Sequence, residues 1–191
     1  GMTKAKLEGL AHNICTTNQL LCSSCQGVFV DTKDLGVAEA FCNDFLPVLD
    51  ATAKGYPAVP LAFRAQNTLQ LYSKRLEAIY GQKAMVFRGE HTSIHLEEDS
   101  TLAVSLQHRT LWVKRLPRQK LVGTLHPYKS YLQTAALLCS SKEWPTLRDR
   151  LWRAGVVRIA GGAEMPESYC GAAHDGVYPL RAYSRVVSAQ K

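Results

Sequence analysis

The sequence predicts an α/β fold in which a mostly parallel sheet is covered by helices on both faces. Segments with apolar residues three and four positions apart, which is the helical spacing, alternate with short apolar runs that are typical of strands. A strand, a helix and a second strand are expected over residues 131–160, in the order of a parallel crossover unit. The chain has 191 residues and 46% of them are hydrophobic, which is enough for one domain with its own core.

The first half of the chain is expected to hold three helices and one strand. Residues 4–16 carry apolar side chains at helical spacing, and residues 28–30 form a short apolar strand. A helix then begins after Asp34, its expected N-cap, and ends near Gly55. A further helix is expected over 61–80, closed by Gly81. We expect its apolar stripe to face the core, and this stripe consists of Leu69, Tyr72, Leu76 and Ile79.

The second half contains most of the predicted strands. A run at 131–139 is apolar over most of its length and is expected to be a buried central strand. It is followed by a helix that ends at Gly155 and by a strand at 156–160, whereas Pro117 and Pro179 each begin a short helix. Other strands are expected at 84–88, 93–96, 102–106 and 111–113.

The chain is basic, with a formal net charge of +7, and the charge is unevenly distributed. No carboxylate lies between Ser100 and Lys142, although seven lysines and arginines do. This stretch is either a solvated basic face or a surface that attracts the phosphates of a nucleotide, a coenzyme or a nucleic acid. Interleaved aromatic residues and recognisable nucleic-acid motifs are missing from it, so nucleic-acid binding is the alternative rather than the first expectation.

Six cysteines occur without a secretory leader, so we expect reduced thiols and a cytoplasmic location. No apolar run approaches the roughly 18 residues of a membrane span. No second pair of ligands follows the Cys22–Cys25 pair at zinc-site spacing, so no metal is expected. A redox pair of cysteines is expected to follow a strand and begin a helix. The Cys22–Cys25 pair instead follows a helix and precedes a strand.

Two interpretations of the segment Cys22-Ser23-Ser24-Cys25 remain. Its cysteines are either small structural residues, or Cys22 is a nucleophile that attacks a carbonyl or thioester carbon. A polar turn between a helix and an apolar strand favours the second interpretation, because such a turn holds a thiol rigidly and within reach of a substrate. Gln19, Ser23, Ser24 and the local N–H groups are the expected hydrogen-bond donors.

A second candidate site is the loop that holds His174 and Asp175. A histidine beside an aspartate in a glycine-rich loop is often only a turn residue. The functional interpretation is that the loop folds back over the cysteine, with Asp175 orienting the imidazole ring.

The segment Gln19-x-x-Cys22-Ser-Ser-x-Gln26, followed by an apolar strand, resembles the nucleophile segment of the fatty acyl-CoA reductase family of bacterial bioluminescence. That family belongs to the aldehyde dehydrogenase superfamily. The resemblance covers residues 4–187, with the matching segments in the family's order. The later segments are Arg109-Thr110, residues 131–134, residues 155–159, Met165-Pro166 and residues 174–180.

The resemblance implies that residues 2–191 are the C-terminal, cysteine-bearing domain of a longer, oligomeric, NADPH-dependent acyl-CoA reductase. Cys22 would take a long-chain acyl group from coenzyme A or an acyl-protein donor, and hydride would release the aldehyde. The main NADPH site is expected outside the chain, since no Gly-x-Gly-x-x-Gly occurs within it. Other subunits of a fatty-acid reductase complex are expected partners, and the isolated chain is expected to accept acyl groups without turnover.

Two positions depart from the family pattern. Cys25 stands where proline is usual, so the turn could acquire a disulfide. Gly123 stands where a glutamate would contact the nicotinamide ribose. An oligomerisation fragment whose cysteine is unused is a further alternative.

Overall fold

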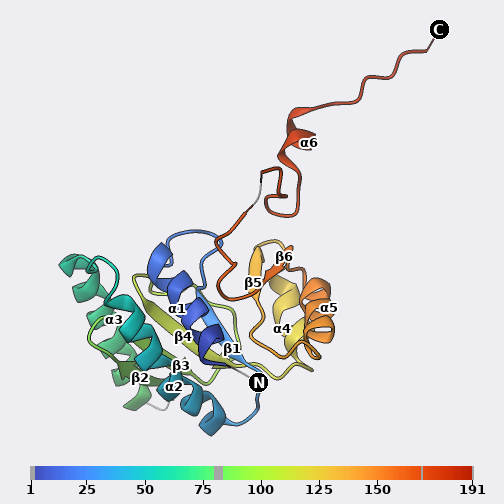
Figure 1. The fold of residues 1–191 in the computed structure, drawn as a ribbon. Coiled ribbons are helices and arrows are strands. Elements are labelled where there is room, and N and C mark those ends of the chain that lie inside the picture. Colours follow the sequence, from blue (N-terminus) through green and yellow to red (C-terminus); the bar gives the residue numbers. More distant parts are fainter. Residues whose placement is uncertain (1–2, 80–83, 169, 191) are drawn as a thin grey trace.

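The main sheet has four strands in the order β1-β4-β3-β2 (Figure 1). It is seen in a computed structural model that describes residues 3–79, 84–168 and 170–190. β1, β4 and β3 run parallel, and β2 pairs antiparallel with β3 through the predicted hairpin. The strands are β1 (Gly27–Val30), β2 (Ala84–Arg88), β3 (Ser93–Glu97) and β4 (Thr110–Arg115). The predicted α/β class with a mostly parallel sheet is confirmed.

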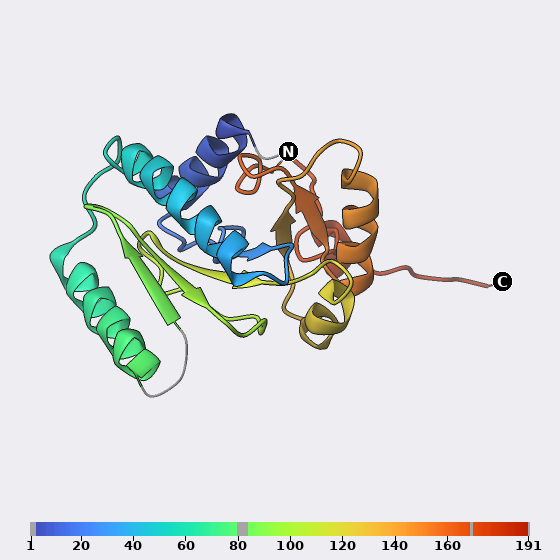
Figure 2. The ribbon, with the colours of Figure 1, turned by 90° about the horizontal axis from the view of Figure 1, so that it is seen from below.

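Helices cover both faces of this sheet (Figure 2). α1 (Lys4–Thr17) and α2 (Leu35–Ala53) lie together on one face and form the main core with it. α3 (Leu61–Ile79) lies on the other face, where the side-chain amide of Asn67 donates to the hydroxyl of Thr110 over 2.9 Å. The residues of β3 and β4 that point toward α2 are Ile94, Leu96, Leu111 and Val113.

Two predictions, one about α1 and one about the start of α2, are confirmed. α1 buries Leu10, Ala11 and Ile14 at helical spacing. The carboxylate of Asp34 accepts a hydrogen bond from the N–H of Gly36 over 2.8 Å, so it caps α2 as expected.

The prediction that the apolar stripe of α3 faces the core was wrong. Its four residues are 51–76% exposed, whereas Asn67 and Leu71 are buried. The sheet face under α3 carries the polar residues Thr110 and Glu97, so the helix turns toward them a row in which Leu71 lies between Asn67 and Lys74. Lys74 contacts the carboxylate of Glu97 there. The helix end expected at Tyr80 and Gly81 lies outside the described residues.

No strand forms at 102–106, in contrast to the prediction. Asp99 accepts a hydrogen bond from the N–H of Thr101 over 2.8 Å and starts a turn. The carbonyl of Ala103 then accepts from the indole N–H of Trp112 over 2.9 Å. Because this carbonyl binds a side chain instead of a neighbouring strand, the segment forms a cover over the buried Trp112.

A second, smaller sheet is built from β5 (Thr134–Ala136) and β6 (Arg158–Ala160) around α5 (Trp144–Ala154). β5 and β6 are parallel, so the predicted strand–helix–strand unit is confirmed, and Gly155 ends α5 with a φ of 104°. The long buried strand expected at 131–139 was wrong. The N–H of Tyr131 closes a turn onto the carbonyl of Tyr128, and the paired residues are only half-buried.

The remaining helices are short. α4 (Leu121–Leu125) begins after Pro117, because the N–H of Lys120 first closes a turn onto the Pro117 carbonyl. A 3-10 turn, η1 (His126–Tyr128), follows it. α6 (Pro179–Tyr183) begins at the expected proline but ends before Val187, and it extends away from both sheets (Figure 1).

None of the helices within residues 3–79, 84–168 and 170–190 has the length and apolar character that crossing a membrane requires.

Candidate functional site: the cysteine turn

The cysteine turn, residues 18–26, joins α1 to β1. α1 ends because Asn18 and Gln19 both adopt left-handed backbone angles, with φ of 48° and 62°. β1 begins at Gly27, where a Cβ atom would lie 1.9 Å from the indole ring of Trp112. Only glycine lets β1 approach β4 this closely, so the position of the turn relative to the sheet depends on Gly27.

Hydrogen bonds hold the backbone of the turn. The side-chain amide of Gln19 donates to the carbonyl of Cys25 over 3.0 Å, and Asn13 Oδ1 accepts from the N–H of Cys25 over 3.0 Å. Ser24 Oγ accepts from the N–H of Leu21 over 3.0 Å. The two bonds to Cys25 are buried and therefore shielded from water, whereas the bond between Leu21 and Ser24 is only partly buried.

Cys22 lies at the exposed outer side of this turn. Within the part of the chain that the structure describes, its sulfur and the N–H groups of Cys22 and Ser23 have no hydrogen-bond partner. Gln19 and Ser24 instead bond the backbone of the turn, and Ser23 is half-buried. The structure therefore shows Gln19 and Ser24 shaping the turn, and their action on a thiolate stays a prediction.

The other cysteine of the turn is in a different environment. Cys25 is 5% exposed, and burial raises the pKa of its thiol to about 12. Its S–H donates to the carbonyl of Gly27 over 3.4 Å. Cys25 is therefore protonated at neutral pH and packs as a small core residue. No group of three metal-ligating side chains occurs among the residues that the structure describes.

Arg109 connects the turn to the rest of the fold. It is 2% exposed, and its Nε donates to Asn18 Oδ1 over 2.9 Å while an Nη donates to the carbonyl of Pro57 over 2.8 Å. The backbone N–H of His108 also donates to the carbonyl of Asn18 over 2.9 Å. Gln107, His108 and Arg109 all have left-handed angles, with φ of 59°, 49° and 66°.

Sequence reasoning did not assign Asn18 and Arg109 this role. The only signal was the Arg109-Thr110 segment before an apolar strand. An arginine so far along the chain could be matched to Asn18 only after the parallel pairing of β1 with β4 was known.

His174 and Asp175 form an exposed pair, with His174 Nδ1 3.0 Å from Asp175 Oδ2. They lie in a two-residue hairpin in which His174 and Val177 exchange backbone hydrogen bonds of 2.9 Å. Asp175 and Gly176 have the positive φ angles, 51° and 78°, that such hairpins need. Gln133 contacts Asp175 and anchors the hairpin beside β5. A role for His174 above Cys22 stays a prediction, because no contact between them is found among the described residues.

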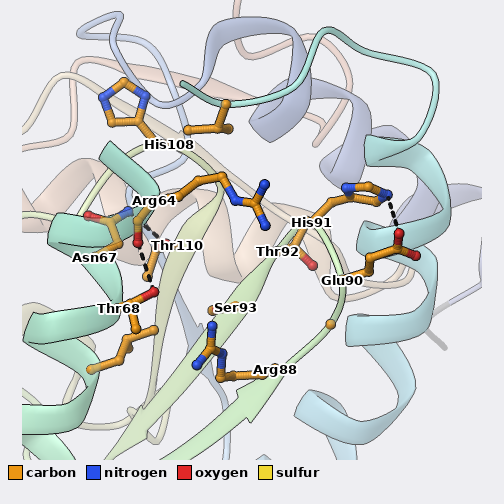
Figure 3. Close-up of a pocket in the computed structure, with 13 residues that line it drawn as sticks. Arg64, Asn67, Thr68, Arg88, Glu90, His91, Thr92, Ser93, His108 and Thr110 are labelled. Carbon is orange, nitrogen blue, oxygen red and sulfur yellow. Dashed lines mark hydrogen bonds and ion pairs between the residues drawn. The ribbon is translucent and has the colours of Figure 1, made fainter. Parts of the chain in front are cut away.

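Two of the hollows formed by the described residues lie near the sheets, and Cys22 lines neither of them. The first is a basic cavity of about 50 Å³ between α3 and the starts of β3 and β4 (Figure 3). The second is an open groove of about 670 Å³ over α5 and β6, with Trp144 and Trp152 in its wall.

These features define an α/β domain of the dehydrogenase-like kind with an exposed cysteine on a fixed turn at one edge of a parallel sheet. The family model of the acyl-CoA reductases (LuxC) matches residues 2–186. The chain therefore belongs to the LuxC acyl-CoA reductase family, which confirms the resemblance inferred from its motifs. A search of the curated proteins found no match.

Proposed function

We propose that the chain performs the acyl-accepting step of an acyl-CoA reductase and that Cys22 is the nucleophile. The observation that carries this proposal is an exposed thiol on a turn whose backbone is held by buried polar side chains. A nucleophile has to be reachable and also fixed in position, and the turn supplies both. The neighbouring Cys25 is also fixed, but it is buried and protonated and is therefore not reachable.

The reaction is a thioester exchange. The Cys22 thiol loses its proton to water, and its sulfur attacks the carbonyl carbon of the acyl-CoA thioester. The tetrahedral oxyanion accepts hydrogen bonds from the N–H groups of Cys22 and Ser23, which have no other partner within the described residues. The bond to the coenzyme A sulfur then breaks, and the released thiolate takes up a proton. An acyl group remains on Cys22.

The family resemblance assigns reduction of this acyl group to NADPH. The basic cavity of about 50 Å³ is much smaller than the roughly 300–1,000 Å³ of small-molecule pockets, so it does not hold a dinucleotide. The open groove over α5 and β6 falls within that range, but its lining is mostly apolar and aromatic and offers the phosphates one charged residue, Arg148, which is paired with Asp149. Gly123, in place of a glutamate, has no neighbour within 4 Å of an added Cβ atom and offers no contact to a ribose. In this proposal residues 2–191 are the cysteine-bearing domain, and another part of a larger, oligomeric enzyme holds NADPH and contacts the other reductase subunits.

Part of the basic stretch at 100–142 is paired with carboxylates. Lys114 is buried with Glu97 and Asp99, 2.9 and 2.7 Å from their carboxylates. Arg118 is paired with Asp31 and Glu143. Carboxylates from elsewhere in the chain therefore neutralise these two cations. Lys120, Lys129 and Lys142 are exposed, so the nucleic-acid alternative stays open.

The test is acylation by a radiolabelled long-chain acyl-CoA, followed by peptide mapping. We expect the label on the peptide that contains Cys22 and its loss in Cys22→Ser. Cys170→Ser removes another exposed cysteine and serves as the matched control, with labelling unchanged. Full labelling of Cys22→Ser would rule out this nucleophile.

A further inference from the structure

We propose that the basic cavity between α3 and the starts of β3 and β4 binds a phosphate monoester, the group that coenzyme A carries on its adenosine ribose. This assignment to coenzyme A rests on the proposed function. NADPH carries the same group on its own adenosine ribose, so the chemistry is shared and the experiment has to separate the two sources.

Two arginines supply the positive charge of the cavity. Arg64 comes from α3 and Arg88 from the end of β2, and Figure 3 shows both guanidinium groups turned toward the space between α3 and the sheet. Neither side chain has a hydrogen bond or ion pair within the described residues. Guanidinium groups bind phosphate oxygens through paired N–H donors, so two free arginines that face one cavity favour a phosphate ligand.

Polar side chains complete the wall. Thr92 and Thr110 are buried there, and Ser93 and Asn67 line the cavity beside them. The amide of Asn67 is bonded to Thr110 Oγ1 at 2.9 Å, and Thr92 Oγ1 is bonded to Asp50 at 3.0 Å, so this wall is held in place. The hydroxyl of Ser93 has no partner in the described part of the chain and can donate to a phosphate oxygen.

Two carboxylates lie near the cavity, and neither contacts an arginine. Glu90 lies 3.8 Å from Lys54 and 3.7 Å from His91, and Figure 3 shows its carboxylate directed to the His91 ring. Asp50 accepts from the N–H of His91 over 2.8 Å, from the N–H of Glu90 over 3.2 Å and from Thr92. Asp50 is therefore satisfied by these donors. Glu90 is exposed and lines the cavity, but its contacts are with Lys54 and His91 and none is with either arginine.

The size of the cavity allows it to hold one phosphate group but not a whole cofactor. Its volume of about 50 Å³ is several times the 10–15 Å³ that one water needs, and far below that of a pocket for a whole cofactor. One phosphate fits, while the rest of the molecule has to continue outside the cavity. A terminal monoester is such a group, whereas the bridging pyrophosphate is attached on both sides.

The cavity lies at the same sheet edge as Cys22. β1, β4 and β3 are parallel, so their first residues, Gly27, Thr110 and Ser93, line one edge. Strands two positions apart are about 10 Å from each other. His108, in the cavity wall, is bonded through its N–H to Asn18 in the cysteine turn. The flexible pantetheine arm of coenzyme A separates its thioester from its ribose phosphate, so one molecule can occupy both places.

The test is calorimetric titration of the full chain with coenzyme A, 3′-dephospho-coenzyme A, NADPH, NADH and inorganic phosphate. We expect coenzyme A to bind at least about tenfold more tightly than its dephospho form, the difference that charged hydrogen bonds supply. Arg64→Gln and Arg88→Gln should each reduce this ratio to near one. Arg75→Gln, on an exposed position of the same helix, is the matched control and should leave it unchanged.

The possible failures are distinct. Equal affinities for coenzyme A and its dephospho form, or no measurable coenzyme A binding, would overturn the proposal. If the protein prefers NADPH over NADH but does not prefer coenzyme A over its dephospho form, the assignment to the acyl donor is overturned. Arg64→Gln should slow acylation of Cys22 by acyl-CoA but not by an acyl-pantetheine thioester, which lacks the nucleotide. The proposed function is tested separately by Cys22→Ser. This variant alone should lose acylation by both the acyl-CoA and the acyl-pantetheine thioester.

Discussion

Arg109 Nε donates a hydrogen bond to Asn18 Oδ1 over 2.9 Å, although 91 positions separate the two residues in the chain. This bond joins the turn that carries Cys22 to the turn that precedes β4. Both turns have left-handed backbone angles, which are costly for residues other than glycine. The tertiary bond is therefore part of what keeps the cysteine turn in its shape.

Replacing Arg109 with Met should loosen the cysteine turn. The buried carbonyl of Ala53 would lose its donor, which costs about 1–3 kcal/mol, and the partly buried acceptors on Asn18 and Pro57 would lose theirs at a smaller cost. We expect a lower free energy of unfolding in urea and slower acylation of Cys22. Arg148→Met, at an exposed pair with Asp149, is the control and should change neither quantity. Unchanged acylation of Cys22 in folded Arg109→Met would show that the bond between Arg109 and Asn18 has no role in the site.

Gly27→Ala should destabilise the protein by about 1–3 kcal/mol, because the new methyl group meets the Trp112 ring. Chemical denaturation would measure the change. Gly123→Ala in α4 is the matched control, since open space surrounds that position and alanine favours a helix. Trp112→Leu should lessen the effect of Gly27→Ala in the double variant. If the effects of Gly27→Ala and Trp112→Leu on the free energy of unfolding are additive, the two positions are not in contact.

Acid should weaken the fold through Glu97. The hydrogen bond with His95, with further bonds from Lys74 and Lys114, holds the pKa of this carboxyl well below its usual range. Because the folded pKa lies below the unfolded value of about 4.3, the ionised group stabilises the fold above that pH. This stabilisation is lost as the pH falls from about 5 toward 2.

Glu97→Gln should therefore be less stable at pH 7, by about 3–5 kcal/mol for a buried network that loses one partner. Its stability should also fall less than that of the wild type between pH 5 and pH 3. Denaturant titrations at several pH values measure both effects. Parallel pH curves for the two proteins would disprove the assignment.

The cysteines should differ in their rate of alkylation in the native protein. Burial raises the pKa of Cys15 to about 11 and those of Cys25 and Cys42 to about 12, and it also blocks the reagent. We expect Cys22 to react with iodoacetamide at pH 8 much faster than these three, as followed by mass spectrometry. All should react once the chain is unfolded in urea. Native labelling of Cys25 at the rate of Cys22 would refute this order.

The orientation of α3 can be tested by paired substitutions. Leu71→Ala should cost about 2–5 kcal/mol because Leu71 is 3% exposed. Leu69→Ala on the opposite side should change the free energy of unfolding by no more than about 0.5 kcal/mol, since that side chain is exposed. A larger loss for Leu69→Ala would place the predicted stripe in the core after all.

The sequence by itself determined the local elements and the family. Helical spacing in α1, the Asp34 cap, the hairpin of β2 and β3 and the glycine that ends α5 all depend on neighbours in the chain. The motif around Cys22 led to the acyl-CoA reductase family, which the family match confirms. Short-range spacing is sufficient for these features because the groups that interact lie within a few residues of each other.

Only the tertiary structure decided which surfaces meet. The face of α3 that is buried was set by the polar row on the sheet beneath it, and residues 102–106 became a cover because Trp112 takes their carbonyl. The bond from Arg109 to Asn18 and the cavity of Arg64 and Arg88 join segments that are distant in sequence. Such contacts depend on the order and register of the strands. Local sequence patterns do not determine either, because strands pair in the way that buries their apolar faces in the assembled fold.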